Sequence, residues 1–474
     1  MELQYRGSGK VYYAEKEYQS DLYYNEKEGG ILLKIIVENE NKLGDYLEVP
    51  FEIPFLCGQL ESGFKYTLLG LVRTGMKDLV SYGITEYTFY ADYILCGIGS
   101  AKSHEQTFHK VSYTLSNIVE WGEVSVYAIG EKYELFSKNE EIKKTIFKRS
   151  DYSIYYSVFG SMLPTSECEL LKEHIEIEQH GIIDIEFQNE EPFYRFCEIF
   201  DKLKRLFEIA ILRRINLEKV TAYSSEIVYS LGDATIEQPI DIYGHNIKEE
   251  AIKENLNNHW WKWISLSELI KNNSFEHYFG KHEKLAPIIE SFLEALYANA
   301  GSNTRAFLNI VQALETYHSR FVTNCINEYK ARVDCLAKAQ SIDNVKELKK
   351  FLLAKSKKFI TLESRLADLL FAEGKIFFDT GEIERNDFPY VISQSRNYYI
   401  HYDERIKEKH RVLSEEELQI YNRALLQILE YYILLELGFS VDTNVELKKK
   451  LIERWGNISQ DLYLLDISKK RHGY

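Results

Sequence analysis

Three residues near the C-terminus, Arg396, Asn397 and His401, have side chains that suit phosphoryl chemistry on RNA. Arginine presents a planar, permanently charged fork that matches phosphate oxygens. Histidine is the side chain whose unperturbed pKa lets it donate or accept a proton near neutral pH. Asparagine can orient the histidine or a phosphate oxygen. Because a ribonucleotide carries its own nucleophile, the 2′-hydroxyl, such a set can cleave RNA without a metal ion.

The spacing of these residues limits how one helix can use them. Asn397 and His401 are four residues apart and share a helix face. Arg396 and His401 are five apart, which places them about 140° apart on an ideal helix. A frayed helix end or a second subunit could bring the two groups together. The Arg-x4-His spacing recurs at Arg405 and His410, where the surrounding charges indicate a solvated turn.

The residues between Asn397 and His401 must hold the polar face in place. Tyr398, Tyr399 and Ile400 carry large apolar surfaces, and we expect them to be buried on the opposite side of the helix. In a dimer, Tyr398 and Tyr399 would instead line the interface around the motif together with a further tyrosine at position 402.

Helical patterns dominate the C-terminal half of the chain. Apolar residues recur every three or four positions, which is typical of a helical bundle. The predicted segments are 264–272, 283–299, 304–335, 345–373, 386–403 and 414–437. Ser414 and Glu417 predict a capping-box start for the last of these, and Gly438 predicts its end.

The N-terminal half has the alternation and the β-branched and aromatic residues of strands. Strands are predicted at 29–39, 65–75, 85–97, 108–121 and 123–130, with one clear helix at 192–214. The two halves together predict an α+β multidomain chain. Its β-rich part covers residues 1–245, and its all-α helical bundle covers residues 246–474.

Composition excludes several classes of protein. The net charge of −15 is incompatible with a broad basic surface that coats nucleic acid, so RNA would need a local basic site. The Lys-rich segment 346–359 could follow an RNA backbone, and a solvated helix face is the alternative. No phosphate-binding glycine loop, HExxH motif or GxSxG motif occurs.

The six cysteines lack the spacing of zinc ligands, so we expect reduced thiols, no metal site and no cofactor. The first residues lack a signal-peptide pattern, and no run of about 18 apolar residues occurs. We therefore expect a cytoplasmic protein without a membrane segment.

Longer stretches of the chain resemble a known family. SRNYYIHYD (395–403), followed by EEELQIYNRALLQILEYYILLELGFS (415–440), resembles the HEPN ribonuclease motif. Upstream, FLNIVQALETYHSRF (307–321) resembles the opening helix of the ApeA-like HEPN domain. In the N-terminal half, GIGSAKSHEQTFHKVSYTLSNIVEWG (97–122) resembles the strand-rich partner domain of that family.

This resemblance implies a metal-independent endoribonuclease that acts in anti-phage defence by abortive infection. Arg396 would contact the phosphate, Asn397 would position it, and His401 would be the general acid or base. The resemblance also implies a homodimer or higher homo-oligomer in which two copies of the motif face each other. Residues 1–245 would form an ApeA-type sensor or regulatory domain that responds to a phage-derived trigger. The RNA substrate would be cellular, and transfer RNA is an attractive candidate.

Other interpretations remain open at this point. A non-catalytic HEPN module for binding or dimerisation is one alternative. A carbohydrate-binding protein built on the β-rich half is another. Glu315 and His318 on the opening helix could approach the motif and assist it, or could occupy ordinary packing and surface positions.

Overall fold

The computed structural model describes residues 6–25, 30–38, 49–99, 105–138, 142–161, 173, 176–231, 234–244, 247, 263–298, 302–322, 361–372, 388–439, 444–457 and 461. Contacts divide the chain into two compact units. The first contains residues 1–204 and 214–258, and the second contains residues 205–213 and 259–474. The first unit is rich in strands and the second is helical, which confirms the α+β fold class. The short segment 205–213 belongs to the helical unit, whereas the prediction assigned all residues up to 245 to the β-rich part.

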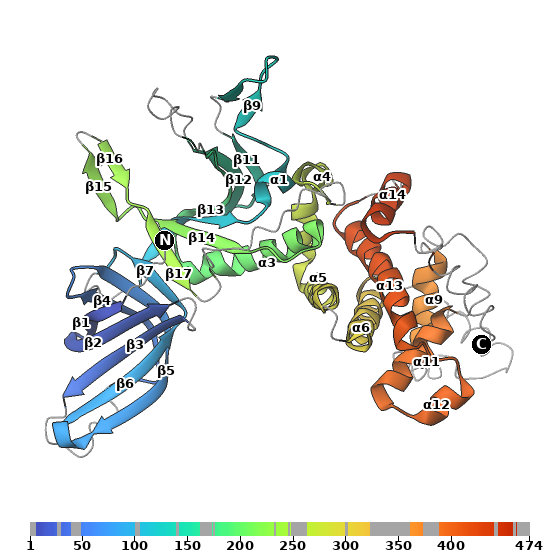
Figure 1. Ribbon diagram of the computed structural model, residues 1–474, viewed down its shortest axis with the longest axis horizontal. Helices are drawn as coiled ribbons and strands as arrows, with labels where there is room; N and C mark the ends of the chain where they lie inside the picture. Colours follow the sequence, from blue (N-terminus) through green and yellow to red (C-terminus); the bar gives the residue numbers. More distant parts are fainter. Residues whose placement is uncertain are drawn as a thin grey trace, which may run out of the picture. The chain divides into compact units, whose positions relative to one another are not determined.

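Six strands of the first unit close into a barrel (Figure 1). The strands are β1 (Arg6–Tyr13), β2 (Lys16–Asn25), β3 (Gly30–Glu38), β4 (Glu52–Leu60), β5 (Lys65–Leu79) and β6 (Ile84–Ala91). All neighbours are antiparallel in the order β5-β4-β1-β2-β3-β6, and β6 pairs back with β5. Alternate residues along β6 are buried, as expected for a strand with one face toward a core. The core includes Val11, Leu22, Ile31, Leu33, Ile35, Tyr66, Tyr87 and Phe89.

Strand β5 belongs to the barrel and also leads into a second stretch of sheet. Its first residues pair with β7 (Tyr93–Cys96), and its later residues pair with β6. The single strand predicted at 85–97 is therefore two strands, separated at Asp92. Gly70 of β5 has φ of 64°, and a side chain there would collide with the carboxylate of Asp92. Glycine permits this close approach.

The rest of the first unit is an antiparallel extension of the same sheet. Its order is β11-β12-β13-β8-β14-β17-β7. The new strands are β8 (Thr107–Leu115), β11 (Ile142–Lys148), β12 (Tyr152–Gly160), β13 (Gln179–Pro192), β14 (Leu217–Tyr223) and β17 (Ile240–Gly244). Two small hairpins accompany it, β9 (Tyr127–Ile129) with β10 (Leu135–Ser137) and β15 (Val228–Leu231) with β16 (Ala234–Glu237).

The predicted helix at 192–214 is confirmed as α3 (Phe193–Ile211). Its apolar side packs on the sheet, where Phe200 stacks on Tyr113 with ring centres 3.9 Å apart. The strand predicted at 108–121 is partly wrong, because β8 ends at Leu115 and α1 (Ile118–Gly122) follows. Asn117 adopts a left-handed conformation, with φ of 60°, which turns the chain out of the strand.

The helical unit is arranged around α13, which is buried along most of its length. Its described helices are α4 (Leu266–Lys271), α5 (Ser274–Tyr297), α6 (Asn303–Phe321), α9 (Leu362–Ala372), α11 (Phe388–His401), α12 (Glu404–Lys409), α13 (Glu415–Glu436) and α14 (Asn444–Trp455). The capping box of Ser414 and Glu417 is present, and Gly438 has φ of 93°, so the predicted start and end of α13 are confirmed.

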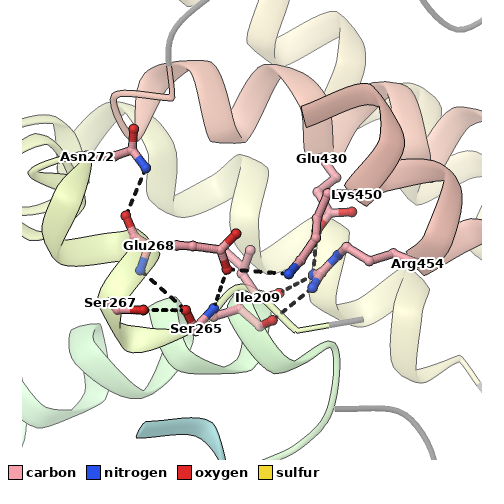
Figure 2. A network of polar contacts seen from close by, with 9 residues as sticks. Ile209, Ser265, Ser267, Glu268, Asn272, Glu430, Lys450 and Arg454 are labelled. Atoms are coloured by element: carbon pink, nitrogen blue, oxygen red, sulfur yellow. Dashed lines mark hydrogen bonds and ion pairs between the residues drawn. The ribbon is translucent and has the colours of Figure 1, made fainter. Parts of the chain in front are cut away.

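A buried polar network fastens helix ends within this unit (Figure 2). The guanidinium of Arg454 on α14 donates to the carbonyls of Ile209 and Ala210, which lie in the last turn of α3. Carbonyls at a helix end lack partners within their own helix, so Arg454 satisfies them. Arg454 also pairs with Glu430 of α13 at 2.5 Å, and both side chains are fully buried. Glu430 accepts a further hydrogen bond from the indole of Trp455.

Some sequence predictions lie outside the described residues. These are the Lys-rich segment 346–359 and the helical patterns over 323–335 and 345–360. Of the helices described, none has the length and apolar content that crossing a membrane requires.

Candidate active site

The three motif residues lie toward the C-terminal end of α11. Arg396 and Asn397 are half-buried, and His401 is exposed as the last residue of the helix. Tyr402 follows with φ of 49°, a left-handed conformation that ends the helix. Asp403 then caps α12 by accepting a hydrogen bond from the backbone N–H of Arg405. The helix end therefore presents His401 to solvent.

Two residues on the buried side of α11 hold the helix in place. The hydroxyl of Ser395 accepts from the backbone N–H of Leu413 at 2.9 Å, and the hydroxyl of Tyr399 donates to the Leu413 carbonyl at 2.6 Å. The Tyr399 ring also meets Phe307 of α6 edge to face. Because Ser395 and Tyr399 are four residues apart, one helix face satisfies both backbone groups of Leu413.

The expectation that all three residues after Asn397 are buried is only partly right. Tyr399 packs inward as described, and Tyr398 is half-buried with its hydroxyl donating to Glu404. Ile400 is 44% exposed, so its predicted burial is wrong. The physical reason is its position about 100° around the helix from Tyr399, away from the side that contacts α6.

The Arg396 guanidinium has two polar neighbours among the described residues. Its Nη1 donates to Oδ1 of Asn397 at 3.3 Å, and its Nη2 lies 4.0 Å from Oε2 of Glu315 on α6. The Arg396 side chain is 35% exposed, so part of the guanidinium faces solvent. Within the described part of the chain, no contact joins Arg396 to His401, in agreement with their separation around the helix.

Glu315 and His318 have different positions relative to the motif. Glu315 lies beside Arg396, whereas His318 is 1% exposed and hydrogen-bonds through Nε2 to Oδ2 of Asp368 at 2.9 Å. Burial lowers the pKa of His318, and the Asp368 carboxylate opposes this effect. His318 also contacts Arg365 on α9, through Nδ1 at 3.4 Å.

Sequence reasoning did not identify Arg365 and Asp368. The sequence feature that could have pointed to them is their separation of three residues within an amphipathic helix, which places both on one face. This spacing is so common in helices that it gives no reason to select these two residues.

The second Arg-x4-His copy lies in a different environment. Arg405 forms a salt bridge with Asp403 at 2.7 Å and is largely exposed. The predicted turn is instead the short helix α12, which buries none of its residues. His410 is half-buried, with Nδ1 2.5 Å from the hydroxyl of Tyr390, so its predicted solvation is wrong. Since Tyr390 lies on α11, this contact places His410 against that helix.

The described residues include no cluster of three or more His, Cys, Asp or Glu side chains that could hold a metal ion. The candidate site therefore consists of Arg396, Asn397 and His401 on α11, with Glu315 of α6 beside the arginine.

Comparison with protein families gives two matches. A family model described as ApeA N-terminal domain 1 matches residues 5–278, more than half of the 474 residues. A second, described as Apea-like HEPN, matches residues 308–443 and so includes the whole candidate site. Comparisons with curated proteins and with solved structures found no match.

Proposed function

The chain belongs to the ApeA family, and from this we propose that it is a metal-independent endoribonuclease that acts in defence against bacteriophage. The HEPN match supports a nuclease-type defence protein. Cleavage of cellular RNA, such as transfer RNA, would stop growth of the infected cell and thereby limit phage multiplication.

The proposed reaction is a transesterification within the RNA. The 2′-oxygen attacks the adjacent phosphorus while the bond from phosphorus to the 5′-oxygen breaks. A base removes the proton of the 2′-hydroxyl, and an acid supplies a proton to the departing 5′-oxygen. The products carry a 2′,3′-cyclic phosphate and a 5′-hydroxyl. His401 serves as the base or the acid, and Arg396 stabilises the charge on the phosphate oxygens.

One observation carries the proposal. Within the HEPN match, α11 places Asn397 and His401 at a four-residue spacing with His401 exposed, while Arg396 keeps part of its guanidinium open to solvent. An exposed imidazole can reach a bound RNA, and a guanidinium held on one side can still donate to phosphate.

We propose that two copies of the chain form the complete site. Arg396 and His401 diverge by about 140° around α11, so groups from two motif helices related by a two-fold axis can act together on one phosphate. Ile400 and Tyr402 are exposed beside His401 and provide apolar surface for such an interface. The first unit would respond to a phage-derived trigger and control access to this pair.

The test compares wild-type chain with His401→Ala, each expressed in cells whose total RNA is sequenced for new 3′ ends. Wild type is expected to produce 2′,3′-cyclic phosphate ends that are absent with His401→Ala. Light scattering on both proteins reports whether they assemble equally. Identical RNA ends from both proteins contradict the proposed chemistry, and equal absence of cleavage in purified proteins favours a non-catalytic HEPN module.

A further inference from the structure

Two helices carry polar pairs of the same spacing and face each other beside α11. Glu315 and His318 are three residues apart on α6, and Arg365 and Asp368 are three residues apart on α9. Residues at this spacing share one helix face. The two faces interlock, because Arg365 lies near both residues of α6 and Asp368 binds His318.

The buried centre of this cluster is His318. Arg365 has only N–H donors, so its 3.4 Å contact through Nη1 requires Nδ1 of His318 to accept. The proton of the neutral imidazole then lies on Nε2 and is donated to Asp368 at 2.9 Å. Burial lowers the pKa of His318, a direction that favours this neutral form. The two contacts therefore select one tautomer and hold the Arg365 side chain.

The exposed end of the cluster is Glu315, whose carboxylate lies between two guanidinium groups. Its Oε1 is 3.9 Å from Nε of Arg365, and its Oε2 is 4.0 Å from Nη2 of Arg396. The Arg365 side chain is only 11% exposed, and its buried Nε has no hydrogen-bond partner among the described residues. The nearby carboxylate of Glu315 compensates the charge of that buried group.

The contacts of Glu315 affect the orientation of the Arg396 side chain more than the free energy of unfolding. Its side chain is 38% exposed, and exposed ion pairs at this distance add little to the free energy of unfolding. The same carboxylate nevertheless attracts one edge of the Arg396 guanidinium and leaves other N–H donors available. An arginine held in this way loses less conformational freedom when it binds phosphate.

We propose that Arg365 is a positioning residue for Arg396. Arg365 is held by His318, which Asp368 holds in turn. Arg365 aligns the Glu315 carboxylate, and Glu315 orients the guanidinium of Arg396. Helix α9 thereby takes part in the site although it carries no residue of the motif. This inference rests on the proposed function, in which Arg396 contacts the phosphate of RNA.

The test is a double-mutant cycle on the full-length chain. Arg365→Met is made in the wild-type and in the Arg396→Ala backgrounds, and affinity is measured for an RNA with 2′-O-methyl groups, which cannot be cleaved. Arg365→Met is expected to weaken binding about tenfold in the wild-type background and not at all in the Arg396→Ala background. In cleavage assays it should reduce kcat/KM by a similar factor.

Arg320→Met is the matched control, because Arg320 also lies on the helix pair but donates to backbone carbonyls of α5. It should leave affinity for the analogue unchanged. Wild-type affinity with Arg365→Met, or an equal loss in both backgrounds, overturns the positioning role. If Arg365→Met does not fold, Glu315→Gln replaces it in the cycle with the same expected coupling.

Failure of the proposed function gives a different result. A wild-type chain that binds the 2′-O-methyl RNA but cleaves no RNA contradicts the ribonuclease assignment, and the coupling between positions 365 and 396 is still read from affinity. A wild-type chain that does not bind the analogue at all overturns both proposals.

Discussion

Two polar networks of the helical unit differ in how much water reaches them. In the first, Glu430 and Arg454 are fully buried and 2.5 Å apart, and Arg454 also binds backbone carbonyls of α3 (Figure 2). In the second, Glu315 and Arg396 are more than one third exposed and 4.0 Å apart. The same pair of residue types thus holds helices together in one place and leaves a guanidinium available to a ligand in the other.

The comparison shows why burial, rather than residue type, separates a structural ion pair from a candidate binding group. A buried charge needs all of its hydrogen bonds satisfied by the protein, so its geometry is tight and its removal is costly. An exposed charge keeps part of its hydration and can exchange that water for a phosphate oxygen.

The largest expected effect is on catalysis. If the proposed role of His401 is right, His401→Ala should lower the rate of RNA cleavage by about 100- to 10,000-fold, because the proposed acid–base group is lost. The thermal midpoint of unfolding should change little, since His401 is exposed. His410→Ala is the control from the second Arg-x4-His copy and should keep its activity. Initial rates on a fluorescent RNA give the comparison, and equal rates for His401→Ala and wild type would place the site elsewhere.

The next effect is on stability. Arg454→Met should reduce the free energy of unfolding by about 3–5 kcal/mol, because it leaves the carboxylate of Glu430 buried without its cationic partner. Glu315→Gln, in the exposed network, should change it by no more than about 1 kcal/mol. Urea unfolding followed by circular dichroism measures both. Similar losses for the two variants would show that burial does not separate the networks.

A smaller effect concerns pH. Burial holds the folded-state pKa of His318 below its usual value of 6.5, so the unfolded chain takes up the proton first as pH falls. The contribution of His318 to stability is therefore complete above about pH 6.5 and is lost as pH falls through the folded-state pKa. Urea unfolding of wild type and His318→Gln at several pH values should show a smaller decrease for the variant. If the free energy of unfolding decreases equally in wild type and in His318→Gln, other groups cause the pH dependence.

Removal of metal ions is expected to have the smallest effect on the rate of RNA cleavage. A reaction that uses the 2′-hydroxyl as nucleophile, with Arg396 and His401 as its catalytic groups, needs no metal-bound water. Cleavage should persist at the same rate in EDTA, and a 2′-deoxy substitution at the cleaved nucleotide should block it. Loss of cleavage in EDTA, with recovery on addition of Mg²⁺, would contradict this chemistry.

Local features of the chain were accessible from the sequence. The capping box at Ser414, the stop at Gly438 and the amphipathic pattern of α3 depend on residues within a few positions of each other. The shared helix face of Asn397 and His401 follows from the same four-residue repeat. Strand patterns were less decisive at their ends, where Asp92 and Asn117 turn the chain out of a predicted strand.

The tertiary structure decided which distant residues meet. The pairing of β3 with β6 joins strands that are far apart in the sequence, and nothing local to β3 identifies that partner. In the helical unit, packing of α6 and α9 beside α11 brings Glu315 to Arg396 and joins His318 to Asp368. These contacts join residues that are far apart in the sequence. The free energy that brings their helices and strands together comes from burial of apolar faces, and such burial does not by itself select one partner for each face. A local repeat therefore specifies a helix and its polar face, whereas only the packed chain specifies what that face contacts.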